Sequence, residues 1–97
     1  MLIKIHDSYR KVVAVCDSDL IGKIFEEGKM QLDVRENFFS GEEVSDEEAV
    51  KILETEKENY VTFNIVGKHA VKMALDAGVI SEGNIGKVDD VPFALVF

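Results

Sequence analysis

The chain has 97 residues, 46% of them hydrophobic and 31% charged, and a formal net charge of −8. This composition is typical of a globular domain and excludes a disordered chain and a uniformly basic nucleic-acid binder. With no apolar run long enough to cross a bilayer and no signal-peptide core in "MLIKIHDSYRK", we expect one domain over residues 1–97, in the cytoplasm and without membrane association.

The negative charge is concentrated in one segment. From Glu42 to Glu58 there are eight acids and two lysines. The favoured interpretation is the solvated face of a helix, and the alternative is an acidic docking surface for a partner.

The N-terminal part predicts a β-hairpin. Residues 2–6 alternate apolar and polar side chains, and residues 11–16 are rich in valine, so these segments are its two arms. The second arm is nearly all apolar, which predicts a central strand covered on both faces. Asp17 then caps a short helical turn that Gly22 ends.

The next segment predicts a second pair of strands. Residues 24–34 read as strand, turn at Gly28, and strand. The following loop carries Phe38 and Phe39, which we expect to fix it to the core, because paired aromatic side chains rarely stay in water.

The clearest helix start is at Ser45. Glu48 lies three residues later, which is the spacing of a capping box. Apolar residues recur with helical spacing after it and predict a buried stripe. They are Ala49, Val50, Ile52 and Leu53.

The C-terminal part predicts strands on either side of a helix. Residues 59–65 alternate as a strand, residues 67–77 form a helix, and residues 84–88 form a strand that can complete a right-handed βαβ unit. The last strand, 91–97, contains Pro92, which cannot donate to a ladder and therefore predicts either an edge strand, the favoured interpretation, or the start of the strand.

Alternation along the last strand predicts which side chains enter the core. Phe93, Leu95 and Phe97 share one face and are expected inside, and the exposed edge offers a surface for homodimerisation. Together the elements predict an α+β fold with a mixed, mainly antiparallel β-sheet and two main helices in a single domain.

A helix start preceded by glycine is a candidate anion site. Free N–H groups and the positive end of the helix dipole suit a phosphate or carboxylate. The candidate residues are Asn64, Gly67, Lys68, His69 and Lys72. The favoured alternative is structural: Asn64 bonds backbone groups at the turn and Gly67 permits a close packing contact.

Cys16 is the only cysteine and a candidate nucleophile, with His6 or His69 as its base. A buried thiol is the favoured interpretation, because Cys16 ends an apolar strand and the neighbouring Asp17 raises a thiol pKa. The two histidines lack ligand spacing and the adjacent acid pairs read as surface groups, so no metal, cofactor or catalytic residue is predicted.

The order of several motifs resembles an archaeal family labelled Domain of Unknown Function 424. The motifs are "AVCDSDLIGKIFEEGKMQLDV", "FFSGEEV", "NIVGKHAVKMALDAGVI" and "VDDVPFA". The matching positions are Cys16, Asp17, Leu20, Gly22, Phe38 or Phe39, Gly41, Asn64, Gly67, Val91 and Pro92. The family pattern places a histidine after Pro92, where this chain has Phe93.

The resemblance implies a small cytosolic archaeal protein without an assigned activity, associated with translation and RNA-related genes. Our leading hypothesis is therefore a non-enzymatic binding module that acts with RNA or a ribonucleoprotein. The chain is acidic and has no RNA-recognition aromatic motif, so a partner protein that itself holds RNA fits better than tight binding of bare RNA. The alternative is a small enzyme or ligand-binding protein for a phosphorylated or anionic metabolite at the turn from Asn64 through Gly67 and Lys68 to His69.

Overall fold

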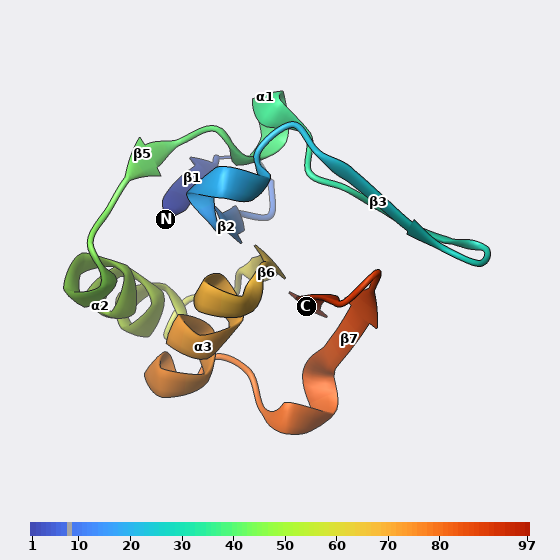
Figure 1. Ribbon diagram of the computed structural model, residues 1–97. Helices are drawn as coiled ribbons and strands as arrows, with labels where there is room; N and C mark the ends of the chain where they lie inside the picture. Colours follow the sequence, from blue (N-terminus) through green and yellow to red (C-terminus); the bar gives the residue numbers. More distant parts are fainter. Residues whose placement is uncertain (8) are drawn as a thin grey trace.

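A six-stranded mixed β-sheet organises the computed structural model, which describes residues 1–7 and 9–97 (Figure 1). In spatial order its strands are β5 (Glu42–Glu43), β1 (Leu2–His6), β2 (Val12–Cys16), β6 (Thr62–Val66), β8 (Val91–Val96) and β7 (Ile85–Val88). The neighbours β2 and β6 are parallel, and the other neighbouring pairs are antiparallel. The predicted α+β class is confirmed.

The two main helices cover the same face of the sheet. They are α2 (Asp46–Glu56) and α3 (Lys68–Ala77), which lie side by side in Figure 1. Their buried side chains form one core with those of the central strands. The alanines of α3 (Ala70, Ala74 and Ala77) are buried, and their small size lets that helix pack closely on the strands.

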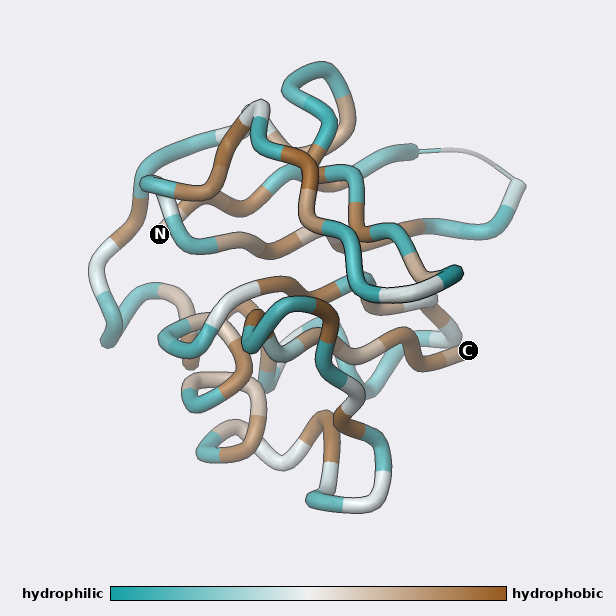
Figure 2. The backbone as a smooth tube through the Cα atoms, turned by 45° about the vertical axis from the view of Figure 1, so that its right-hand side comes forward, coloured by the Kyte–Doolittle hydropathy of each residue, from teal (hydrophilic) through white to brown (hydrophobic). Residues whose placement is uncertain are grey.

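The opposite face carries a second, smaller core. It is covered by the short helix α1 (Glu36–Phe39) and by the hairpin of β3 (Ile24–Glu27) and β4 (Met30–Asp33). Two 3₁₀ turns, Ser18–Leu20 and Glu82–Asn84, complete the elements. Because both faces are covered, the central strands are mostly apolar, as the brown stretches of Figure 2 show, although β6 also carries Thr62 and Asn64.

Local signals set the ends of both main helices as predicted. Ser45 Oγ accepts the N–H of Glu48 at 3.2 Å, and Glu48 Oε1 accepts the N–H of Ser45 at 3.2 Å, so the capping box is confirmed. Gly78 ends α3 with φ of +76°, a left-handed conformation that favours glycine. No helix in the described part of the chain is long and apolar enough to span a membrane.

The segment expected to be a loop contains α1. Phe39 is buried, as expected, and Phe38 stacks on His6 with ring centroids 4.6 Å apart. The Phe38 carbonyl also lies 2.8 Å from His6 Nε2. His6 therefore holds α1 on the sheet.

The predicted edge position of the last strand is wrong. β8 pairs with β6 on one side and with β7 on the other, so Pro92 lies near the start of an internal strand. The Pro92 carbonyl accepts the Gly67 N–H at 2.8 Å, so this residue contributes as an acceptor although it cannot donate. A homodimer through β8 would have to use the end of the strand beyond β7, at Leu95 and Val96.

The predicted inner face of β8 is also wrong. Ala94 is fully buried and Val96 half-buried against the helices, whereas Leu95 and Phe97 are exposed. Phe93 is half-buried in the second core. The sheet is covered on both faces, so a pattern that assumes one buried face does not identify the helix side.

The predicted βαβ unit is present in modified form. β6 and β7 are both antiparallel to β8, so they run in the same direction with α3 between them in sequence. β8 separates them in the sheet. The adjacent parallel pair is instead β2 and β6.

Candidate functional site

The start of α3 is already occupied by a carboxylate of the same chain. Asp17 Oδ2 accepts the N–H of His69 at 3.1 Å, and Asp17 Oδ1 accepts the N–H of Ala70 at 2.7 Å. The Asp17 side chain makes no cap hydrogen bond to the turn that follows it, so the predicted capping of that turn is wrong. Asp17 instead caps a helix more than 50 residues later.

Gly67 is what allows this carboxylate to approach. Its φ is +111° and its ψ is 153°, a region that is essentially restricted to glycine. A Cβ atom at Gly67 would lie 2.4 Å from Asp17 Cγ. The sequence predicted that Gly67 permits a close packing contact, and this contact is made with the side chain of Asp17.

The other residues of the predicted anion site are only partly brought together. Lys68, His69 and Lys72 are exposed on α3, and His69 Nε2 lies 2.5 Å from Asp46 Oδ1 at the start of α2. Asn64 is half-buried in β6, and strand alternation places it on the sheet face away from α3. An external anion at the first turn would have to displace Asp17.

Cys16 is placed as a buried thiol. It has no exposed surface, and burial, followed by the nearby Asp17 carboxylate, raises its pKa from 9.0 to about 11. Cys16 pairs with Leu2, whereas His6 pairs with Val12 at the other end of the same two strands. The geometry does not bring His6 to the thiol.

Some of the acidic residues make structural contacts, among them Glu27 and Glu43. Within residues 1–7 and 9–97, no group of three or more His, Cys, Asp or Glu side chains could hold a metal ion. Glu27 Oε1 accepts the N–H of Asp89 at 2.7 Å and ties the β3–β4 hairpin to the turn before β8. Asp89 and Asp90 form that turn with φ of 49° and 67°.

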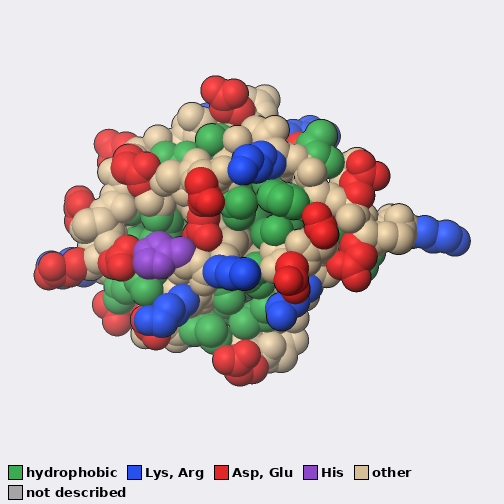
Figure 3. All heavy atoms as spheres, in the orientation of Figure 1, with side chains coloured by type: hydrophobic (Ala, Val, Ile, Leu, Met, Phe, Trp, Pro, Cys, Tyr) green, Lys and Arg blue, Asp and Glu red, His purple; other side chains and the backbone are tan. Residues whose placement is uncertain are grey.

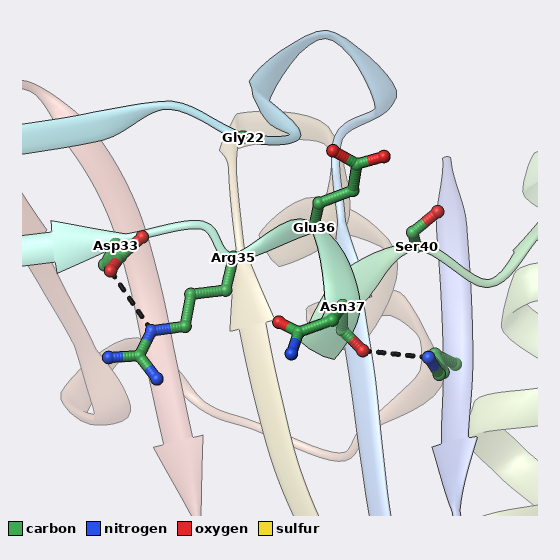
Figure 4. Close-up of a pocket in the computed structure, with 7 residues that line it drawn as sticks. Gly22, Asp33, Arg35, Glu36, Asn37 and Ser40 are labelled. Atoms are coloured by element: carbon green, nitrogen blue, oxygen red, sulfur yellow. Dashed lines mark hydrogen bonds and ion pairs between the residues drawn. The ribbon is translucent and has the colours of Figure 1, made fainter.

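A hollow of about 740 Å³ beside α1 contains charges that compensate one another (Figure 4). Arg35 Nε donates to Asp33 Oδ2 at 3.1 Å, and Lys4 Nζ donates to the Asn37 carbonyl at 2.8 Å. Its two cationic side chains are thus engaged within the fold. This hollow supports α1 more readily than it recognises a charged ligand.

A second hollow, of about 460 Å³, lies where β2 and β6 begin and β8 ends. Its floor is apolar and includes the buried side chains of Val61 and Phe63. Its rim carries Tyr60, which is 96% exposed, and Phe97, which is 78% exposed. We call this site the aromatic hollow.

Polar and cationic groups surround the aromatic hollow. Arg10 and Lys57 line it together with the Asn59 amide. Lys57 Nζ donates to the Ala77 carbonyl at 3.0 Å, which holds this cation at the end of α3. Glu58 is the acid among the lining residues. The hollow thus combines positive charge with apolar surface in a protein of net charge −8.

Sequence reasoning missed this site. Tyr60 follows the polar run "EKEN", and Tyr9, which is fully exposed, stands in "DSYRK" beside Arg10. The available signal was one aromatic residue, Tyr60, in the polar segment that connects α2 to β6. Neither segment contains a motif that indicates that Tyr60 and Arg10 line one hollow.

Comparisons with known proteins support the fold and name no activity. The family model described as "Protein of unknown function (DUF424)" matches residues 5–97. A crystal structure of an uncharacterized conserved protein from Methanopyrus kandleri is similar, with 32% identity and a TM-score of 0.82 over 98% of this chain and 88% of that chain. A search of curated proteins gives no match.

Proposed function

The chain belongs to the DUF424 family, whose description names no activity, and from this premise we propose that it is a non-enzymatic binding module for single-stranded RNA. The aromatic hollow is the proposed contact site. The observation that carries the proposal is the placement of exposed Tyr60 and Phe97 around an apolar floor, with Arg10 and Lys57 beside it.

The shape and surface of the hollow suit a nucleobase. A base is flat and apolar on its faces, so it can stack on Tyr60 or Phe97 and cover the half-buried side chains of Val79 and Val96. The volume of about 460 Å³ lies within the range of small-molecule sites. The Asn59 amide nitrogen donates to Glu56 Oε2 at 3.5 Å, and its second N–H and its oxygen can serve the polar edge of a base.

The two cations suit the backbone that accompanies a base. Arg10 can contact a phosphate with two N–H groups, and Lys57 adds a point charge close by. The rest of the surface opposes long-range attraction. On the face shown in Figure 3, acidic side chains alternate with lysine and arginine. We therefore expect weak, local and salt-sensitive binding of an unpaired segment.

The lining residues match binding better than catalysis. Tyr60, Phe97 and the floor provide stacking and apolar contact, while Arg10 and Lys57 provide fixed charge. Lys57 is held at the end of α3 by its hydrogen bond to Ala77. Such groups orient a ligand, and the proposal assigns none of them a proton transfer.

The test is the fluorescence anisotropy of a labelled single-stranded RNA of about 10 nucleotides. Replacing Tyr60 with alanine should weaken binding about tenfold, because base stacking on an aromatic side chain contributes about 1–3 kcal/mol. Tyr60→Phe keeps the ring and should bind within about twofold of the natural chain. A duplex of the same sequence should bind more weakly, because its bases are already stacked.

The controls are variants outside the aromatic hollow. Ile24→Ala removes an exposed apolar side chain from β3, and Lys87→Ala removes an exposed cation from β7. Each should leave the affinity within about twofold. Equal losses in Tyr60→Ala and Ile24→Ala would contradict the proposal. Equal binding of a free mononucleotide would assign the hollow to a phosphorylated metabolite instead.

A further inference from the structure

We propose that a groove between α2 and α3 docks a short basic segment of a partner protein. The groove has a volume of about 420 Å³ and is separate from the aromatic hollow. The expected segment inserts an apolar side chain between the helices and places lysine or arginine on either side. This inference does not depend on RNA binding.

The groove exists because the two helices run side by side in the same direction. His69 Nε2 contacts Asp46 Oδ1 where the helices begin, and Lys57 Nζ donates to the Ala77 carbonyl where they end. Between these contacts, Val50 of α2 and Met73 of α3 line the groove. Val50 is half-buried, so an apolar partner atom can cover surface that water now contacts.

The rim of the groove is acidic. Asp46, Glu47 and Glu54 project from α2, and Asp76 projects from α3. One lysine, Lys51, lies on the rim, and its Nζ is 3.5 Å from Glu47 Oε1.

Two of the four acids on this rim, Glu54 and Asp76, are not compensated within the described chain, whereas Asp46 contacts His69 and Glu47 pairs with Lys51. Among residues 1–7 and 9–97, no ion pair forms at Glu54 or Asp76. Both side chains are exposed. They stand on opposite helices across an apolar strip, so a basic segment lying in the groove meets a carboxylate on each side.

Charge favours a basic protein segment over the other occupants. Nucleic acid is repelled by this rim, and a second copy of a chain with net charge −8 brings further acidic surface. An amphipathic segment with apolar anchors between basic residues matches both features of the groove, which is the helix-in-groove mode of recognition. On the face shown in Figure 3, acidic side chains lie next to apolar surface.

The test is calorimetric titration with a synthetic peptide of about 14 residues, built from leucine, lysine and alanine with leucine at helical spacing. The Glu54→Gln/Asp76→Asn variant should bind about tenfold more weakly. The matched control, Glu26→Gln/Glu82→Gln, makes the same change in net charge at exposed positions elsewhere and should stay within about twofold. Amide chemical shifts should move at residues 46–54 and 73–76.

Three results would overturn the inference. Equal weakening by the two double variants would show general attraction between a basic peptide and an acidic protein. Equal binding of a peptide with glutamine in place of leucine would show that no apolar anchor enters the groove. Sedimentation that shows a dimer of this chain, lost in Val50→Ser, would assign the groove to a second copy.

Discussion

The two ends of the parallel strands β2 and β6 differ in whether the chain itself covers them. At their carboxyl ends, Asp17 reaches across and closes the start of α3 over Gly67. At their amino ends, Tyr60 and Phe97 remain exposed around an apolar floor. In open sheets of parallel strands the ligand usually binds at the carboxyl ends, yet here that end is filled by the chain itself.

The difference separates a motif that resembles a site from a surface that can act as one. A glycine, two lysines and a histidine around a helix start look like anion recognition, but the N–H groups of His69 and Ala70 already donate to Asp17 of the same chain. Tyr60 has no motif around it and leaves most of its surface in water. An exposed aromatic ring contributes little to folding, so it is the better indicator of binding.

The largest expected effect is at the closed end. Gly67→Ala should lower the free energy of unfolding by about 3–5 kcal/mol, because the new Cβ is strained at φ of +111° and displaces the Asp17 cap. Chemical denaturation of the purified variant measures this change.

Gly22→Ala is the matched control for this strain. Gly22 also has a positive φ, +79°, but a Cβ there has no atom within 4 Å. Its cost should be about 1–2 kcal/mol. Equal costs at the two glycines would show that the contact with Asp17 carries no weight, and a non-additive Gly67→Ala/Asp17→Ala pair would confirm that it does.

The next effect concerns Cys16, also at the closed end. Its pKa rises from 9.0 to about 11 in the folded chain, so the unfolded chain loses the proton first as the pH increases. This contribution to stability is complete below pH 9 and is lost between pH 9 and about 11, by up to about 1.4 kcal/mol per pH unit.

Denaturation midpoints across this pH range should fall more steeply for the natural chain than for Cys16→Ala. The thiol should also resist a bulky alkylating reagent at neutral pH until the chain unfolds. Rapid labelling of the folded protein would contradict the buried placement and reopen the nucleophile hypothesis.

A smaller effect is expected at the neighbouring helix start. Ser45→Ala should cost about 1 kcal/mol, because the Glu48 N–H loses its acceptor in the capping box. Ser45→Asp keeps an acceptor and should restore most of this stability. An unchanged midpoint in Ser45→Ala would mean that the contacts between α2 and α3, including the pair of Asp46 and His69, fix this end by themselves.

Sequence reasoning succeeded where the determining interactions are local. The capping box of Ser45 and Glu48 spans three residues, and Gly78 needs only the last turn of its own helix. The turn before β8 is local too, but Asp89 and Asp90 adopt positive φ values, which are uncommon outside glycine although aspartate takes them more often than most residues.

The missed features depend on distant segments. Asp17 caps a helix 52 residues away, and β8 enters the sheet between two strands that precede it in the chain. The aromatic hollow requires the turn before β2, the end of α2 and the end of β8 to meet. Pairing and register of this kind are set by the whole fold, so the sequence did not identify the residues that line the aromatic hollow.

The smallest expected effect lies at the open end and tests the comparison most directly. Tyr60→Ala should change the free energy of unfolding by less than about 0.5 kcal/mol, because 96% of this side chain is already in water. Phe63→Ala, in the floor of the same hollow, should cost about 3–5 kcal/mol, because that ring is buried. Tyr60 and Phe63 are only three positions apart, so comparing the two variants separates the effect of side-chain exposure from the effect of position in the fold.

If Tyr60→Ala costs as much as Phe63→Ala, the tyrosine belongs to the core and its exposure cannot be attributed to a ligand. If it costs nothing and weakens RNA binding, the aromatic ring is retained for recognition, in contrast to Gly67 at the other end of the strand, which is retained for the fold.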